Sequence, residues 1–248
     1  MAGAAVEEGR PRRTAIVTGA SRGIGFELAA TLAEMGYGLT VVARKPEPLK
    51  RAAAALRERG CEVFALPADM AGDSVGEIAT AHESRFGRLD VLVNNAGLGV
   101  PAALGEVTER DLDLQLDVNL RGTILLCRSC LPALGAAGAE HGCATIVNVA
   151  SMAARFGFAG LSVYAAAKAG LLGFGRSLNR ELGARGVKTV TLLPGYVDTT
   201  MGDYAPGAVD SAEMMSTEDI ARAVRFVLEL SPRCVVPEIG FARPGADY

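Results

Sequence analysis

The amino-acid sequence predicts an α/β fold in which helices cover both faces of a doubly wound parallel sheet. Short, almost wholly apolar runs alternate along the chain with longer runs of helical character. Strands that are apolar throughout are typical of a parallel sheet covered on both faces, and repeated strand–helix units place such strands side by side. The chain has 248 residues, of which 50% are hydrophobic and 21% charged. A substantial core is therefore available, and one domain over residues 14–248 is favoured over two small ones.

The first half of the chain predicts four strands separated by helices. The run Thr14–Thr18 contains only apolar or β-branched residues, which is typical of a buried strand. A glycine-rich turn follows it, and Glu47–Arg59 reads as a helix because it is rich in alanine and charge. The other elements predicted here are a helix over Ile24–Met35, strands over Leu39–Ala43 and Glu62–Leu66, a helix over Ser74–Phe86 and a strand over Leu89–Val93.

The second half predicts longer helices. Glu109–Leu134 is a long helical region, and Val163–Arg185 is a helix rich in glycine and alanine. The late helix would be capped by Ser216 or Thr217, whose hydroxyls suit a helix N-terminus. The remaining predicted elements are strands over Ala144–Val149 and Lys188–Leu193, the late helix over Thr217–Leu230 and an edge strand over Cys234–Ile239.

Charge and terminal composition exclude several classes of protein. The net charge of -3 gives no basic field for nucleic acid. Residues 1–13 are small and polar and end in Arg-Pro-Arg-Arg, without the apolar stretch of a signal peptide, and no later run is expected to span a bilayer. We therefore expect a flexible tail over residues 1–13 and a cytoplasmic protein without membrane partners. The basic cluster could instead be a targeting or contact element.

The five cysteines include one pair, Cys127 and Cys130, at a spacing that can serve redox or metal chemistry. The pair lies inside an apolar helical run, there is no second pair, and the chain has only two histidines. A metal site would therefore lack ligands, so packed core thiols are the favoured interpretation and no metal is predicted.

A glycine-rich segment follows the first strand and opens the first helix. It reads Thr18-Gly19-Ala20-Ser21-Arg22-Gly23-Ile24-Gly25, with the spacing Gly-x-x-x-Gly-x-Gly. Glycines here let the backbone turn sharply and approach a pyrophosphate, which a helix N-terminus can hold. Such a loop can also be a purely structural turn. Its place after the first strand of an alternating α/β chain favours dinucleotide binding.

The end of the second predicted strand bears on the choice of cofactor. An NAD site usually presents an acidic residue there to the ribose hydroxyls. This strand ends instead in Ala43-Arg44-Lys45. The forked guanidinium of Arg44 suits a 2′-phosphate, and Arg22 in the glycine loop could reach the same group. Both could be solvated surface charges, but together they favour NADP(H) over NAD(H).

Tyr164 and Lys168 are four residues apart on a predicted helix, with Ser151 thirteen residues before the tyrosine. Side chains at this helical spacing share one face. A nearby ammonium should lower the tyrosine pKa below its ordinary value of about 10, which suits proton transfer near neutral pH. Alone, the pair could be an ordinary amphipathic pair.

These motifs together resemble the short-chain dehydrogenase/reductase superfamily, whose fold is a Rossmann-like sheet. The resemblance runs in order from Thr14 to Asp198. Besides the glycine loop, Ser151 and the Tyr-x-x-x-Lys pair, the motifs that carry it are Asp69, Asn94-Asn95-Ala96-Gly97, Asn119 in Asp117-Val118-Asn119, and Pro194-Gly195.

The resemblance implies a cofactor site and a catalytic group. Asp69 would contact the adenine with Met70 beside it, and the remaining cofactor-binding residues implied are Gly19, Ser21, Arg22, Gly23, Ile24, Gly25, Arg44, Asn95, Ala96, Gly97, Tyr164, Lys168, Pro194, Gly195, Val197 and Thr199. Tyr164 would exchange the proton with the substrate oxygen and Lys168 would lower its pKa and bind the nicotinamide ribose. Ser151 would hydrogen-bond the substrate carbonyl, and Asn119 would hold a water that links the lysine to solvent.

The implied activity is NADP(H)-dependent hydride transfer to a carbonyl or from an alcohol of a small molecule. The alternative is a regulatory or scaffold protein that binds NADP without catalysis, which the intact tyrosine–lysine pair argues against. Residues 199–216 would close over the substrate; Met201, Tyr204, Met214 and Met215 there suit a partly hydrophobic carbonyl compound or simply pack the loop.

Two further expectations concern the assembly. The chain lacks the Asp-Gly-Gly ending of many ketoacyl-carrier-protein reductases, which argues against that activity and against the tetramer contact such tails build. The resemblance implies a homodimer, or a homotetramer, whose subunits meet through the helices that begin near Glu109 and Val163.

Overall fold

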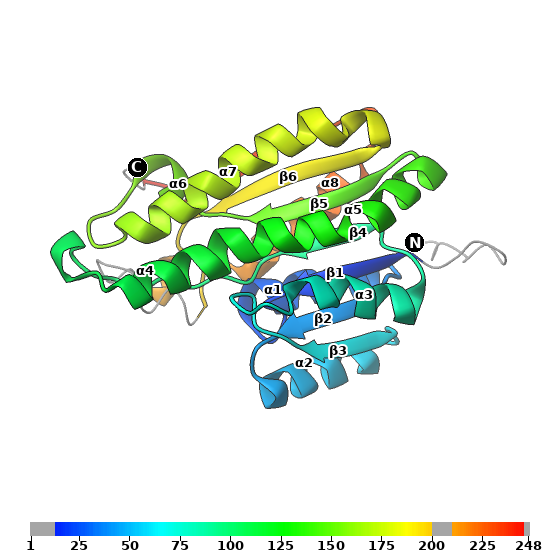
Figure 1. The fold of residues 1–248 in the computed structure, drawn as a ribbon, viewed down its shortest axis with the longest axis horizontal. Coiled ribbons are helices and arrows are strands. Elements are labelled where there is room, and N and C mark those ends of the chain that lie inside the picture. The colour runs from blue at the N-terminus through cyan, green and yellow to red at the C-terminus, as the bar shows by residue number, and fades with distance from the viewer. Residues whose placement is uncertain (1–12, 200–209, 246–248) are drawn as a thin grey trace.

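The computed structural model describes residues 13–199 and 210–245. In this part of the chain seven strands form one sheet in the order β3-β2-β1-β4-β5-β6-β7, and every neighbouring pair is parallel (Figure 1). The strands are β1 (Thr14–Thr18), β2 (Gly38–Ala43), β3 (Val63–Pro67), β4 (Val91–Asn94), β5 (Ala144–Val149), β6 (Val187–Pro194) and β7 (Glu238–Phe241). The predicted α/β fold with a doubly wound parallel sheet is confirmed.

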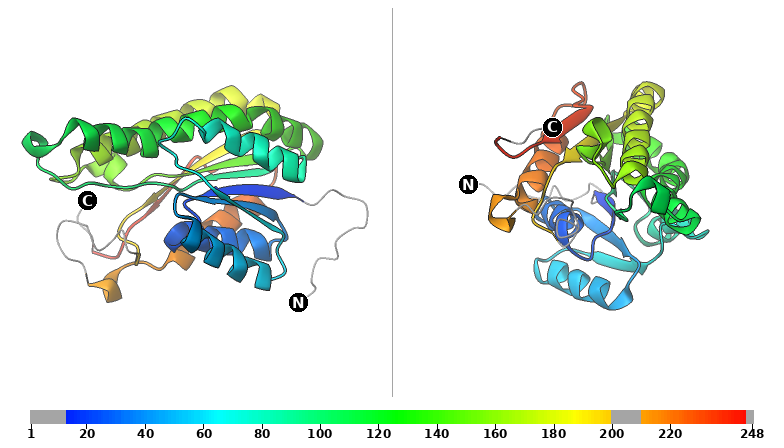
Figure 2. Two further views of the ribbon diagram at one scale, coloured as in Figure 1. Left: turned by 60° about the horizontal axis from the view of Figure 1, so that its bottom comes forward. Right: turned by 90° about the vertical axis from the view of Figure 1, so that its left-hand side faces the viewer.

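Helices cover both faces of this sheet, as Figure 2 shows from the side. They are α1 (Gly23–Glu34), α2 (Pro46–Glu58), α3 (Val75–Phe86), α4 (Glu109–Leu116), α5 (Gly122–His141), α6 (Ala153–Phe156), α7 (Ser162–Leu182) and α8 (Thr217–Glu229). Helices α1, α2 and α8 contribute to the apolar cluster on one face, and α3, α5 and α7 to the cluster on the other. Short 3₁₀ turns lie at Leu104–Glu106, Gly183–Arg185 and Ser211–Glu213.

The apolar composition of the strands follows from this two-sided covering. In β1, Ala15 and Val17 pack into the cluster with α1 and α8, whereas Ile16 between them packs into the cluster with α3 and α5. Successive side chains of a strand point to opposite faces. Because helices cover both faces of the sheet, a polar residue at any position of this strand would be buried.

The long helix predicted over Glu109–Leu134 differs most from the structure. It was expected to end at Leu134 but continues to His141, where Gly142 takes a left-handed φ of 73° and ends it. The alanine- and glycine-rich segment after Leu134 therefore extends the helix. Within the run, Asp117–Arg121 forms a π-helical segment, η2, between α4 and α5. The spacing of apolar residues did not predict that segment.

This same run forms a helix that, by length and composition alone, is long enough and apolar enough to cross a bilayer. The expectation that no segment reaches that length was wrong for Glu109–His141. Its most apolar window is 44% buried inside the protein, and α5 packs against β4, β5 and α3. The length and apolar character of this helix follow from its packing against the sheet.

Three smaller predictions are settled by local contacts. The edge strand begins at Glu238 and not at Cys234, because Pro237 just before it has no N–H to give to a ladder. Ser216 is the cap of α8: its hydroxyl accepts the N–H of Asp219, whose carboxylate accepts the N–H of Ser216. Helix α6, after β5, lies where a loop was expected.

Part of the predicted organisation lies outside the described residues. The tail over residues 1–13 is described only at Arg13, whose carbonyl accepts the N–H of Gly38. Met201 and Tyr204 of the expected substrate loop also lie outside. The described stems of that loop pair through a single bridge between Val197 and Met215.

Candidate active site

The predicted site residues gather at one edge of the sheet, where the carboxyl ends of its strands lie. Because neighbouring strands are parallel, the segments that follow them all begin at this edge. The glycine loop follows β1, Asn95-Ala96-Gly97 follows β4, Ser151 follows β5, and Pro194 ends β6. Figure 1 shows α6 and the start of α7 beside the ends of β5 and β6.

The glycine loop packs directly against the end of β4. The Asn95 side-chain amide donates to the carbonyls of Thr18 (3.0 Å) and Gly19 (3.3 Å). A Cβ on Gly19 would lie 2.7 Å from that amide nitrogen and 2.9 Å from the Cα of Ala96, and a Cβ on Gly25 would collide with the same amide. Gly19 also has a φ of 66°, which favours glycine. These two glycines are therefore required by close packing with Asn95.

Thr18 joins the same two strand ends and was not among the predicted site residues. Its hydroxyl accepts the N–H groups of Asn95 and Ala96, each at 3.0 Å, and lies 3.3 Å from the carbonyl of Val93. One hydroxyl and one amide thus set the shape of this corner. The signal in the sequence was the threonine at the end of β1 next to the first glycine.

The N-terminus of α1 completes a site that suits an anion. No side chain of the described residues caps this helix, so its first N–H groups remain available for a phosphate. Gly23 starts the helix with a φ of 55°, and a Cβ there would lie 3.2 Å from the Thr199 methyl group. Ser21 is half-buried in the loop, and Ile24 packs against the core beneath it. This arrangement fits a dinucleotide pyrophosphate.

Two exposed cations flank the loop. Arg22 precedes α1, and Arg44 directly follows β2, whose Val42 carbonyl accepts the N–H of Ala20 at 3.1 Å. Within the described ranges neither guanidinium forms an ion pair. Both side chains are therefore available to an anionic ligand at this end of the sheet.

Asp69 and Met70, predicted near the adenine, have clear structural roles. The Asp69 carboxylate accepts the N–H of Ala71 at 3.0 Å and so holds the turn after β3. The Met70 side chain is buried in the core, and its carbonyl lies against Gly122 at the start of α5. No described residue bonds the second carboxylate oxygen of Asp69, which remains available to a ligand.

The segment after β6 is anchored on both sides. The Pro194 carbonyl accepts the N–H of Met152 at 2.9 Å, and the N–H of Gly195 donates to the Phe241 carbonyl at 3.0 Å. Val197 is buried, and Thr199 lies against Gly23 of the glycine loop. The end of β6 therefore connects the segment that carries Ser151 with the glycine loop.

Ser151, Tyr164 and Lys168 come together as predicted. Ser151 forms a side-chain hydrogen bond with Tyr164, and its oxygen also accepts the N–H of Ala153 at 3.1 Å. Lys168 is 3% exposed; its Nζ lies 5.7 Å from the centre of the Tyr164 ring and donates to the Val149 carbonyl at 2.9 Å. One turn of α7 and the end of β5 thus place two hydroxyls and an ammonium in one small volume.

The expected lowering of the Tyr164 pKa is not found. Burial of the phenol raises the pKa of Tyr164, and the hydrogen bond from Ser151 opposes this only in part. Burial also lowers the pKa of Lys168 to about 8. The lysine donates to the Val149 backbone, and desolvation of the phenol and the ammonium disfavours the charged form of each.

The buried lysine leads to a prediction for stability. The Lys168 pKa is lower in the folded protein than its ordinary value, so the unfolded chain binds more protons between pH 8 and 10.5. Wild-type stability should therefore rise with pH across this window. Replacement by methionine, Lys168→Met, should raise the free energy of unfolding at pH 7 by roughly 1–3 kcal/mol, and the difference should shrink towards pH 10.

Urea unfolding of the cofactor-free protein at pH 7 and pH 9.5 measures this difference. The matched control is Lys50→Met, since Lys50 is exposed on α2 and, among the described residues, pairs only with Glu47 three residues before it. That control should change stability by less than about 1 kcal/mol at either pH. A Lys168→Met protein that is less stable than wild type at pH 7 would contradict the prediction.

Asn119 lies in the π-helical segment η2 and faces the site. Its amide nitrogen donates to the carbonyls of Leu98 (2.7 Å) and Gln115 (2.8 Å), and its oxygen accepts the Leu98 N–H at 3.1 Å. A Cβ on Gly97 would lie 2.8 Å from that oxygen and 3.1 Å from Lys168 Nζ. Asn119 thus anchors the loop after β4 beside the lysine, a role that sequence reasoning missed; its expected water remains a prediction.

The cysteine pair takes no part in this site. Cys127 and Cys130 are both buried in α5, and burial raises the pKa of Cys127 to about 12. They are packed thiols, as expected. In the described ranges no group of three or more His, Cys, Asp or Glu residues is placed to hold a metal ion.

Comparison with known proteins agrees with this geometry. The family described as short chain dehydrogenase matches residues 13–208. The 3-oxoacyl-[acyl-carrier-protein] reductase FabG of Staphylococcus epidermidis is 35% identical over 191 residues, which cover 76% of this chain and 77% of that protein.

Two solved structures share the fold. One is an alcohol dehydrogenase from the archaeon Thermococcus sibiricus, complexed with 5-hydroxy-NADP. It has a TM-score of 0.86 and is 31% identical in sequence, and the match covers 95% of this chain and 98% of that chain. The other is the NADH-dependent reductase A1-R′ responsible for alginate metabolism. It has a TM-score of 0.80 and is 25% identical in sequence, and the match covers 92% of this chain and 96% of that chain. The chain therefore belongs to the short-chain dehydrogenase family and is an oxidoreductase.

Proposed function

We propose that this protein is an NADP(H)-dependent carbonyl reductase or alcohol dehydrogenase. The observation that carries the proposal is the grouping of Ser151, Tyr164 and Lys168 at the same edge of the sheet as the glycine loop. When bound, the nicotinamide cofactor supplies the hydride for reduction of a carbonyl or accepts it on oxidation of an alcohol. The protein's own residues bind the substrate oxygen and move its proton.

Each of the three side chains has a part in this chemistry. The hydroxyls of Ser151 and Tyr164 bind the carbonyl oxygen and stabilise the charge that develops on it. The Tyr164 hydroxyl gives its proton to that oxygen in reduction and takes it back in oxidation. The Lys168 ammonium, 5.7 Å from the phenol ring centre, stabilises the phenolate left behind. Burial keeps the phenol protonated between turnovers, as a proton donor requires.

The preference for NADP(H) is part of the proposal. Arg44 at the end of β2 and Arg22 in the glycine loop are exposed where an acidic residue would select NAD. The Thermococcus protein was solved with an NADP derivative. The alginate reductase is NADH-dependent, so the fold alone does not decide between the cofactors, and the arginines carry the argument.

The proposal is tested by NADPH oxidation with a panel of neutral aldehydes and ketones, followed by the absorbance loss of the nicotinamide. Steady, enzyme-dependent oxidation supports it. Binding of NADPH without turnover of any panel member would instead support the alternative, a regulatory or scaffold protein that binds NADP. The complete set of Ser151, Tyr164 and Lys168 favours catalysis.

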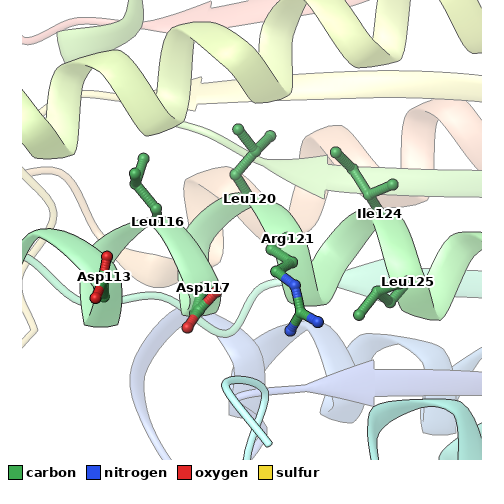
Figure 3. Close-up of a pocket in the computed structure, with 7 residues that line it drawn as sticks. All are labelled: Asp113, Leu116, Asp117, Leu120, Arg121, Ile124 and Leu125. Atoms are coloured by element: carbon green, nitrogen blue, oxygen red, sulfur yellow. The ribbon is translucent and has the colours of Figure 1, made fainter. Parts of the chain in front are cut away.

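We also propose that the protein is a homodimer, or a pair of dimers, that meets through the outer surface of α4, η2 and α5. A cavity of about 380 Å³ lies on this surface. Figure 3 shows two rows along the helix, one of Leu116, Leu120 and Ile124 and one of Asp113, Asp117 and Arg121. Across a two-fold axis the acidic end of one copy faces the basic end of the other, which makes the surface self-complementary.

Charge reversal tests this assembly. Arg121→Asp should convert a dimer into a monomer in sedimentation velocity, because it places like charges across the axis. Adding Asp113→Arg and Asp117→Arg should restore the dimer. An unchanged sedimentation coefficient in the single variant, with a folded circular dichroism spectrum, would show that the copies meet elsewhere or not at all.

A cytoplasmic location and a single domain over residues 14–248 complete the proposal. The five cysteines are all free thiols, which suits a reducing compartment. All strands of the described residues join one sheet.

A further inference from the structure

A buried amide on α4 holds the loop that follows β4. Gln115 is 1% exposed. Its side-chain oxygen accepts the N–H of Val100 at 3.0 Å, and its side-chain nitrogen donates at 3.2 Å to the carbonyl of Asp111, one helical turn earlier. An amide oxygen can only accept and an amide nitrogen can only donate, so these two bonds fix the orientation of the side chain. The oxygen of Gln115 is thereby held towards Val100.

Asn119, four residues further along the same helical run, binds the same loop. Its amide nitrogen donates to the Leu98 carbonyl, and its oxygen accepts the Leu98 N–H. The same nitrogen also donates to the backbone carbonyl of Gln115 at 2.8 Å. Side chains four residues apart on a helix are neighbours. The two amides therefore act together, one on Leu98 and the other on Val100.

The glycines that alternate with these two loop residues lie against the catalytic pair. A Cβ on Gly99 would lie 3.5 Å from the Tyr164 ring, an ordinary van der Waals distance, so Gly99 packs on the phenol. A Cβ on Gly97 would lie 3.1 Å from Lys168 Nζ. The loop over residues 97–100 thus touches both side chains on which the proposed proton transfer depends.

The position of this loop depends on the two amides. Among the described residues, every hydrogen bond of residues 97–101 goes to Gln115 or Asn119. The next bond along the chain is from the Ala102 N–H to the Gly160 carbonyl at 2.9 Å. Without the Gln115 amide, the stretch between Leu98 and Ala102 would have no hydrogen bond to the rest of the protein.

We propose that Gln115 is a positioning residue: by binding Val100 it keeps the loop over residues 97–100 packed on Tyr164, and so keeps the phenol aligned with Ser151. This inference rests on the proposed carbonyl reductase activity. A small displacement of a reacting group slows the chemical step. The glycine loop that would bind the cofactor follows a different strand, so loss of the amide should lower kcat and leave NADPH affinity almost unchanged.

Three replacements separate the length of this side chain from its hydrogen bonds. Gln115→Met has the length without the amide, and Gln115→Asn has the amide but is one methylene shorter. Each should lower kcat for the best ketone of the panel by roughly fivefold or more, with the Kd of NADPH within about threefold of wild type. Gln115→Glu keeps both the length and the acceptor. Burial favours its protonated form, which also donates, so at pH 6 its kcat should stay within about threefold of wild type.

Hydrogen exchange of the Val100 amide, followed by NMR on the cofactor-free protein, reports on the loop without any turnover. Exchange should be roughly tenfold faster in Gln115→Met and Gln115→Asn than in wild type, because the N–H has lost its acceptor. In Gln115→Glu at pH 6 it should stay close to the wild-type rate. This readout separates a displaced loop from a general loss of activity.

The matched control is Asn179→Leu. The Asn179 amide also binds backbone, since it accepts the Thr189 N–H at 2.7 Å and donates to the Thr189 carbonyl at 2.6 Å. It lies on α7, the helix that carries Tyr164, but fifteen residues after the tyrosine, which is about 22 Å along the helix axis. Asn179→Leu should lower the free energy of unfolding while kcat stays within about twofold of wild type and Val100 exchange is unchanged.

Each outcome decides the question. A kcat near the wild-type value in Gln115→Met and Gln115→Asn overturns the inference, even if Val100 exchanges faster. An equal loss of kcat in Gln115→Glu or in Asn179→Leu also overturns it, because any disturbance of packing would then have the same effect. If one of the Met and Asn variants does not fold, the other still decides. Wild-type protein that binds NADPH and reduces no ketone overturns the proposed function, and the inference with it.

Discussion

Replacing Tyr164 with phenylalanine should lower kcat by roughly 10²- to 10⁴-fold. The variant loses the hydroxyl that we propose binds the substrate oxygen and carries its proton, while the ring keeps its contacts with Gly99 and with Lys168. NADPH affinity should stay within about threefold of wild type, because the glycine loop and Arg44 are untouched. Stopped-flow measurement of NADPH oxidation and fluorescence titration of NADPH measure the two quantities separately.

The matched control for Tyr164→Phe is Tyr196→Phe. It removes a phenolic oxygen from a second tyrosine at the same edge of the sheet, two residues after Pro194. Turnover in Tyr196→Phe should remain within severalfold of wild type. Near-normal turnover in Tyr164→Phe would sink the assignment of Tyr164 as the proton donor.

Replacing Arg44 with aspartate should shift cofactor preference from NADPH towards NADH. A hydrogen bond to a charged group contributes about 1.5–3 kcal/mol, so loss of the guanidinium alone lowers the kcat/KM ratio of NADPH to NADH by about 10- to 100-fold. The new carboxylate repels a 2′-phosphate and can accept hydrogen bonds from ribose hydroxyls, which moves the ratio further in the same direction.

Arg51→Asp is the control for Arg44→Asp. Arg51 is also exposed and lies on α2, close in sequence, and the variant has the same change in net charge. A local phosphate contact predicts a shift in Arg44→Asp and little or none in Arg51→Asp. Equal shifts of the NADPH-to-NADH ratio in both variants would indicate an effect of the protein's overall charge. An unchanged ratio in Arg44→Asp would contradict a contact between Arg44 and the 2′-phosphate.

The fold could be predicted because its determinants are local and repeated. Each buried strand is a short apolar run, and the two-sided covering that makes it apolar is visible without any knowledge of contacts. The site could be placed because the carboxyl ends of parallel strands meet at one edge. Thus Gly19, Asn95, Ser151 and Pro194, which lie in four distant segments, could be assigned to one location from the sequence.

What could not be predicted depends on contacts between distant segments. The π-helical turn at Asn119 is stabilised by hydrogen bonds to Leu98, 21 residues away. The spacing of apolar residues along the sequence does not indicate such a partner. The sign of the Tyr164 pKa shift depends on how completely the phenol is buried, which the Tyr-x-x-x-Lys spacing does not encode. The contact between the Phe158 and Tyr196 rings joins two separate loops.

The locking of the glycine loop by Asn95 has a consequence for turnover. The amide of one residue ties the loop to the end of β4 through hydrogen bonds made entirely within the protein. These contacts hold the loop without a ligand, so a nucleotide that binds there would not have to supply the free energy of ordering it. Oxidised and reduced cofactor would then exchange on the same preformed surface, and the fraction of each that is bound would follow the ratio of the two nucleotides in solution.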